Sequence, residues 1–181
     1  MTAGAAPVVL VARSAELEEE RFAKVNALVE AAFERRFDEI WANIGPGIHV
    51  IAEVAGEPVG HAMVVERELH IGEPGLRCGY VENVAAAPTL RGRGVGSVVM
   101  RRIAQVIDDD FEIGALATGS RHFYERLGWE TWLGPTFAWR DAERLRTAGH
   151  DGDVMVLRVA ATPPFSGDEP ISVAWRRGEV W

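Results

Sequence analysis

The spacing of apolar residues changes along the chain, and these changes predict the order of its elements. A helix-like apolar stripe predicts a helix over 16–33, capped by Ser14, and a shorter helix follows over 37–43. The Ala55-Gly56-Glu57 turn joins two of the predicted strands in a hairpin. Apolar runs bounded by turn residues predict strands over 8–12, 49–54, 58–69, 76–86, 111–118 and 154–159.

The second half of the chain adds two more helices. A glycine-rich turn and an amphipathic helix occupy 91–107, and the acidic run 108–110 ends that helix as a solvated turn. A short helix over 120–127 begins at Ser120. The resulting order, βααβββαβαβ, is typical of an α/β fold with a mixed central sheet and helices on both faces. The length fits one domain, residues 1–181.

The composition narrows the function classes. A formal charge of −8 argues against a nucleic-acid partner and suits a cationic substrate, although many proteins are this acidic for solubility alone. No apolar run is long enough for a membrane span, and the N-terminus lacks a signal-peptide pattern, so we expect a cytoplasmic protein. The single Cys78 fits a reducing compartment, and the histidines lack metal-ligand spacing, so no metal site is expected. The polar stretch 140–148 is expected to be surface.

The most informative segment is Arg91-Gly92-Arg93-Gly94-Val95-Gly96-Ser97, which follows an apolar strand. A glycine-rich turn that opens a helix points several backbone N–H groups at one spot near the positive end of the helix dipole, which favours a phosphate or pyrophosphate. The Gly-Lys-Ser/Thr of a Walker loop is absent, and the glycines are spaced G-x-G-x-G, unlike a dinucleotide fingerprint. The pattern that fits is Arg-x-x-Gly-x-Gly.

With this strand, turn and helix, the chain resembles the GCN5-related N-acetyltransferase (GNAT) superfamily. The resemblance implies the GNAT acyl-CoA N-acyltransferase fold, with acetyl-CoA as co-substrate and its pyrophosphate on backbone N–H groups. It also implies that the strand splays at 84–86 and pairs there with the pantetheine arm. The cofactor-binding residues that it implies are Val84, Ala85, Ala86, Arg91, Gly92, Arg93, Gly94, Val95, Gly96 and Ser97.

Further segments are similar to the aminoglycoside 2'-N-acetyltransferases. They lie at 76–82, 114–116, 127–136 and 175–181, of which the last reads Trp-Arg-Arg-Gly-Glu-Val-Trp. This resemblance implies an enzyme that acetylates the 2'-amino group of an aminoglycoside antibiotic, by direct attack of the amine on the thioester, and thereby confers resistance. It also implies a homodimer, to which Trp175 can contribute.

Three groups are candidates for the chemistry of acetyl transfer. Glu82 is an acidic residue in an otherwise apolar strand, and the resemblance assigns it to substrate binding and to removal of the amine proton. The alternative is a salt-bridged strand glutamate. Tyr124 lies a few residues before a Gly-Trp pair, which implies a general acid for the departing thiolate, with a core tyrosine as the alternative. The backbone N–H of Val84 is the natural oxyanion donor.

Acidic and aromatic residues are candidates for holding the substrate. Trp181 offers a flat ring and a carboxylate, and Glu179 lies on the same side of an extended tail. The alternative is a tail that packs its tryptophan into the core. Asn83 adjoins Glu82 and is included. Weaker candidates, with solvated surface or a core position as the alternative, are Glu34, Asp38, Trp41, Asp151 and Asp153.

The sequence departs from this family in the substrate region. Arg35 and Arg36 occupy the N-terminal loop where the family has acids, Ala117 lacks a family hydroxyl, and the late acidic pair is reduced to His150-Asp151. We therefore expect an acceptor less cationic than gentamicin, such as kasugamycin. Two alternatives stay open: an acetyltransferase for another small-molecule amine or a protein N-terminus, and a non-catalytic acyl-CoA-binding module.

Overall fold

The computed structural model describes residues 6–73, 75–141 and 143–181. Its elements, in chain order, are β1 (Val8–Arg13), η1 (Ser14–Glu16), α1 (Glu19–Phe33), α2 (Asp38–Ile44), β2 (Ile48–Val54), β3 (Glu57–Ile71), β4 (Leu76–Ala86), η2 (Pro88–Leu90), α3 (Val95–Asp110), β5 (Ile113–Ala117), α4 (Arg121–Glu125), β6 (Glu130–Thr131), β7 (Thr136–Arg140), β8 (Glu143–Arg146), η3 (Ala148–His150), β9 (Val154–Arg158) and β10 (Ile171–Ala174). The sheet is mixed, as predicted, because β4 and β5 pair in parallel whereas β2 and β3 pair antiparallel.

These elements form two compact units. The first comprises Met1–Val65 and Val81–Ile103, and the second comprises Glu66–Tyr80 and Ala104–Trp181. The chain therefore passes from one unit to the other within β3, β4 and α3. None of the described helices is long and apolar enough to cross a membrane.

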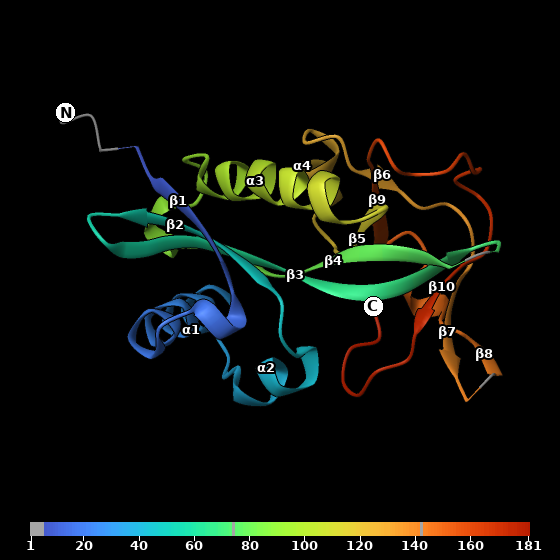
Figure 1. Ribbon diagram of the computed structural model, residues 1–181, viewed down its shortest axis with the longest axis horizontal. Coiled ribbons are helices and arrows are strands. Elements are labelled where there is room, and N and C mark those ends of the chain that lie inside the picture. Colours follow the sequence, from blue (N-terminus) through green and yellow to red (C-terminus); the bar gives the residue numbers. More distant parts are fainter. Residues whose placement is uncertain (1–5, 74, 142) are drawn as a thin grey trace. The chain divides into compact units, whose positions relative to one another are not determined.

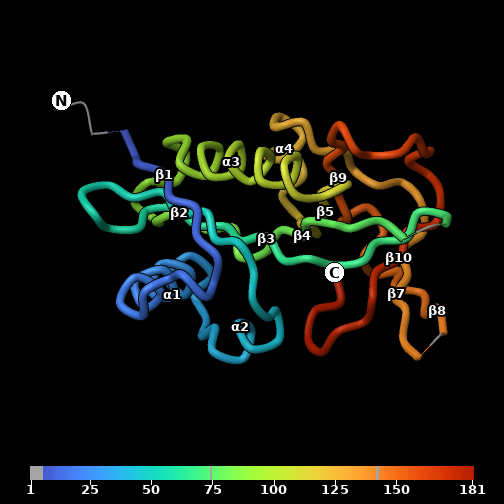
Figure 2. The backbone as a smooth tube through the Cα atoms, viewed as in Figure 1, coloured from blue at the N-terminus to red at the C-terminus, as the bar shows by residue number. Residues whose placement is uncertain are grey.

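The first unit is built on the β2–β3 hairpin, to which β1 adds an antiparallel strand. Ala55 and Gly56 both have positive φ, 53° and 80°, as a tight hairpin turn requires. Figures 1 and 2 show α1 and α2 on one side of these strands and α3 on the other, which confirms helices on both faces. A buried cluster joins α1 to β2 and β4 through Val25, Val29, Phe37, Ile51 and Ala85.

In the second unit the strands follow the order β6-β9-β5-β4-β3-β10-β7-β8. The late strand β10 inserts between β3, with which it is antiparallel, and β7, with which it is parallel. This insertion brings the C-terminal segment beside the middle of the chain. Trp132 is fully buried and its indole N–H donates to the Glu169 carbonyl at 2.9 Å, so the tryptophan fixes the loop before β10.

Several details of the sequence prediction were wrong. Ser14 is not the cap of α1, because a 3-10 turn intervenes and its hydroxyl oxygen instead accepts from the Gly47 N–H at 2.9 Å. The acidic run 108–110 belongs to α3, although carboxylates oppose the dipole at a helix C-terminus. Asp108 is compensated there by the Ala160 N–H, at 3.2 Å. Residues 143–146 are exposed, as expected for the polar stretch 140–148, but they form the strand β8, which the sequence did not predict.

Candidate active site

The glycine-rich turn presents backbone N–H groups to open space. Gly92 and Gly94 have positive φ, 75° and 86°, and a Cβ at either position would meet no atom within 4 Å. The Val98 N–H donates to the Gly94 carbonyl at 3.0 Å. The N–H groups of residues 95–97 precede this bond and have no partner within the helix. The turn thus has the form of an anion site, with room for a phosphate.

Two contacts within the first unit fix this turn. The Arg91 guanidinium donates to the Ala32 carbonyl in the last turn of α1, at 2.7 Å. Gly60 on β3 lies so close to the start of α3 that a Cβ would come within 2.5 Å of Val95 and 3.1 Å of Val99. The Arg91 side chain therefore anchors the turn and leaves the main-chain N–H groups of residues 95–97 for a phosphate.

The strand β4 is irregular near its C-terminal end, a few residues before the glycine-rich turn. Asn83 has a φ of 52°, a left-handed conformation that asparagine adopts at lower cost than most residues. In the described chain, the register of β4 with β5 runs from Cys78–Ile113 to Tyr80–Ala115. The strand was expected to splay at 84–86. The left-handed residue, Asn83, lies one position before that stretch.

This irregularity changes what β4 presents. Three consecutive residues, Glu82, Asn83 and Val84, are half-buried, whereas a regular strand alternates between its two faces. Ala85, the next residue, is buried in the α1 cluster. The expected catalytic residues Glu82 and Val84 therefore lie together on a locally distorted strand, in the same unit as the glycine-rich turn.

Tyr124 lies on α4 in the second unit and is 8% exposed. Its ring packs edge-on against Phe123 and Trp129, with centroid distances of 4.8 Å and 6.3 Å. Burial raises the pKa of its phenol to about 12, so the hydroxyl keeps its proton at neutral pH. A protonated phenol is the form that a general acid requires.

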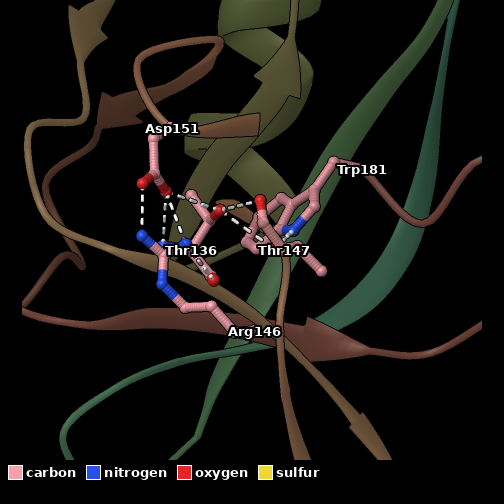
Figure 3. A network of polar contacts seen from close by, with 5 residues as sticks. All are labelled: Thr136, Arg146, Thr147, Asp151 and Trp181. Atoms are coloured by element: carbon pink, nitrogen blue, oxygen red, sulfur yellow. Dashed lines mark hydrogen bonds and ion pairs between the residues drawn. The ribbon is translucent and has the colours of Figure 1, made fainter. Parts of the chain in front are cut away.

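The C-terminal residue is held by a polar network within the second unit. Trp181 is 4% exposed and its indole N–H donates to the Thr147 hydroxyl at 2.9 Å. Figure 3 shows how Thr136 continues the network from Thr147 to Asp151, whose carboxylate also pairs with Arg146. The Arg146 hydrogen bond is the main cause that lowers the pKa of Asp151. Asp151 is thus engaged in supporting the tryptophan, a role that the sequence did not indicate.

A second support for the tail is Arg67 on β3, which the sequence analysis did not single out. Its guanidinium donates to the carbonyls of Val180, at 2.6 Å, and Ala174, at 2.5 Å. The same group lies 4.8 Å from the centroid of the Tyr80 ring. Arg67 therefore clamps both ends of the segment that carries Glu179, which is exposed.

Replacing Arg67 with methionine should loosen this tail. The change keeps much of the side-chain length but removes both hydrogen bonds from a charged donor, which are worth roughly 1.5–3 kcal/mol each in other proteins. We expect faster hydrogen exchange in residues 175–181, measured by mass spectrometry, with unchanged exchange in α1. Equal exchange in the variant and the parent would contradict the clamp.

The remaining candidates lie in the first unit. Asp38 begins α2 and accepts from the Arg36 guanidinium at 2.7 Å. Trp41 donates to Asn26 at 2.6 Å and lines a cavity of about 430 Å³, together with Phe22, Met63 and His49. Among the described residues, no group of three or more His, Cys, Asp or Glu side chains is arranged to hold a metal ion.

Comparisons with known proteins agree with this geometry. Residues 13–132 match the family model described as an acetyltransferase (GNAT) domain. The aminoglycoside 2'-N-acetyltransferase of Mycolicibacterium fortuitum is 34% identical over 173 residues, which cover 93% of this chain and 89% of the relative.

Two solved structures show the same fold. The Escherichia coli GNAT family N-acetyltransferase YhbS in complex with CoA has a TM-score of 0.66 at 14% identity, covering 95% of this chain and 92% of that one. A GCN5-related N-acetyltransferase from Kribbella flavida has a TM-score of 0.58 at 21% identity, and the match covers 72% of this chain. The matched part spans about a third (34%) of that longer protein.

Proposed function

Because this chain belongs to the GNAT acetyltransferases, and within them to the family of its Mycolicibacterium relative, we propose that it acetylates the 2'-amino group of an aminoglycoside. The observation that supports this most strongly is the extent of the similarity, which covers 93% of the chain. A match to the family domain alone ends at residue 132, before the late strands and the tail. The proposed physiological role is antibiotic resistance.

The residues present fit acetyl-CoA, which supplies the activated acetyl group. We assign the N–H groups of residues 95–97, together with the turn 91–94, to its pyrophosphate, because this turn is open and carries N–H groups without helical partners. The main chain of 84–86 is assigned to the pantetheine arm, by analogy with an added strand.

Each proposed catalytic group has a separate task. Glu82 takes a proton from the substrate ammonium, directly or through water, so that the amine can attack. The Val84 N–H donates to the oxygen that becomes negative, where a fixed donor stabilises charge most. The Tyr124 hydroxyl, which is protonated at neutral pH, supplies the proton for the departing thiolate.

The preferred acceptor is an aminoglycoside with fewer positive charges than gentamicin, such as kasugamycin. Two carboxylates expected to bind ammonium groups are each engaged by an arginine of their own unit: Asp38 by Arg36, and Asp151 by Arg146. A carboxylate already paired in this way offers less attraction to a further cation. Both arginines therefore favour a less cationic substrate.

Replacing Arg36 with glutamine should shift this preference. The change leaves Asp38 without its guanidinium partner at 2.7 Å, so kcat/KM for gentamicin is expected to rise about 3- to 10-fold, with a smaller change for kasugamycin. Arg158→Gln is the matched control, because it also removes one charge from an ion pair, with Glu130 at 3.1 Å. An equal response of both variants would contradict a role of Arg36 in specificity.

A panel of aminoglycosides with acetyl-CoA, monitored by thiol release and product mass, tests the function. Turnover of kasugamycin in preference to gentamicin supports the proposal, and better use of gentamicin counts against the reduced-charge acceptor. Turnover only of polyamines or peptide N-termini favours the second candidate function, and CoA binding without turnover favours an acyl-CoA-binding module. We further propose a cytoplasmic homodimer: light scattering on a sizing column tests the dimer, and cell fractionation tests the compartment.

A further inference from the structure

A chain of hydrogen bonds crosses the interior of the first unit and ends on the distorted strand. The Ser14 hydroxyl lies 3.0 Å from His49 Nε2, His49 Nδ1 lies 3.0 Å from His61 Nε2, and His61 Nδ1 lies 3.0 Å from the Asn83 carbonyl oxygen. The two histidines are 2% and 0% exposed and lie diagonally on β2 and β3. Neither the predicted catalytic groups nor the phosphate turn accounts for this pair.

The donors and acceptors of this hydrogen-bond chain can all be matched in one direction only. A carbonyl oxygen only accepts, so His61 Nδ1 must donate to it, and the neutral ring then accepts at Nε2. His49 Nδ1 must therefore donate, and His49 Nε2 accepts from Ser14, whose oxygen is itself held by the Gly47 N–H at 2.9 Å. Burial lowers the pKa of His49 to about 4 and, with the help of His49, that of His61 to about 3, so both rings are neutral at physiological pH.

The rings have little freedom to leave these positions. Trp41 packs edge-on against His61 at 5.8 Å between centroids, and Phe22 packs edge-on against His49 at 6.3 Å. Buried polar groups in such surroundings are costly unless they are hydrogen-bonded, so the hydrogen bonds of this pair offset the cost of burying it. What it binds is the carbonyl of the left-handed residue, Asn83, between Glu82 and Val84.

A left-handed residue other than glycine costs on the order of 1–2 kcal/mol and persists only where its surroundings hold it. We propose that His61, supported by His49, is a positioning residue that holds the Asn83 carbonyl and thereby sets the directions of the Glu82 side chain and the Val84 N–H. This inference rests on the proposed function of those two groups. His61 itself touches neither substrate.

The test compares His61→Leu with His61→Asn. The two new side chains have nearly the same shape, but only asparagine has an N–H group near the place of Nδ1. We expect His61→Leu to lower kcat about 10- to 100-fold with a much smaller change in KM for acetyl-CoA, and His61→Asn to recover most of that loss. Val156→Ala, in the other unit and equally buried, serves as a control for stability alone.

Equal kcat in the two His61 variants, or a parent-like kcat in His61→Leu, would overturn the inference. If the parent protein turns over no amine, the proposed function fails, and the role of His61 must be tested without activity. Imidazole ¹⁵N spectra of the parent protein should show the proton of both buried histidines on Nδ1. A proton on Nε2 of His61 would overturn the inference, because Nδ1 then cannot donate to Asn83.

Discussion

Glutamine in place of Glu82 is expected to lower kcat by about 10²- to 10³-fold, with the affinity for CoA nearly unchanged. The glutamine keeps the size of the side chain on the distorted part of β4 but cannot accept a proton from the substrate ammonium. The loss should shrink as pH rises, since more of the substrate amine is then neutral without help. Steady-state kinetics from neutral to alkaline pH, with calorimetric titration of CoA, measure both effects.

Glu57→Gln is the matched control, since it neutralises a glutamate beside the turn of the β2–β3 hairpin, where Glu57 pairs with Lys24 at 2.9 Å. Its kcat should equal that of the parent. A Glu82→Gln variant that keeps more than half of the parent kcat would show that Glu82 is a salt-bridged strand glutamate with no part in proton transfer.

Valine in place of Gly94 should weaken CoA binding about 10²-fold. Gly94 has a φ of 86°, where a β-branched residue is strongly disfavoured, so the turn must change its backbone conformation. The N–H groups of residues 95–97 then lose their common direction, and each hydrogen bond lost to a charged group costs roughly 1.5–3 kcal/mol. Calorimetric titration of CoA measures the affinity directly.

Gly72→Val gives the matched control for backbone strain. Gly72 has a φ of 71°, and a Cβ there would also meet no atom within 4 Å, but it lies in the second unit. Both variants should lose stability in thermal unfolding, and only Gly94→Val should lose CoA affinity. If Gly94→Val binds CoA as tightly as the parent does, the pyrophosphate is not held at this turn.

The conformation of the glycine-rich turn could be predicted from sequence because its signal is local. The glycines at 92 and 94 and the helix that follows lie within a few residues of one another. Glycine adopts positive φ readily, so the residue type alone indicates such a turn. The same holds for the hairpin at 55–57 and for the strand 76–86, whose bounds the structure reproduces as β4.

Other parts of the site could not be predicted, because their partners are far apart in the chain. Arg67 and Ala174 are separated by 107 positions and Arg67 and Val180 by 113, and no spacing pattern links them. Asp151 was a reasonable substrate ligand by charge, yet it is engaged by Arg146 and Thr136. The strand β8 gave no signal, since an exposed edge strand needs no alternating apolar residues.

The most direct measurement is the position of the acetyl group on the product. After incubation of the parent protein with acetyl-CoA and kasugamycin, two-dimensional NMR of the purified product should place one new acetyl group on the 2'-nitrogen, with one thiol released per product. Acetylation at another nitrogen would contradict the proposed regiochemistry. Absence of thiol release with every aminoglycoside offered, from a protein that binds CoA, would contradict the central claim.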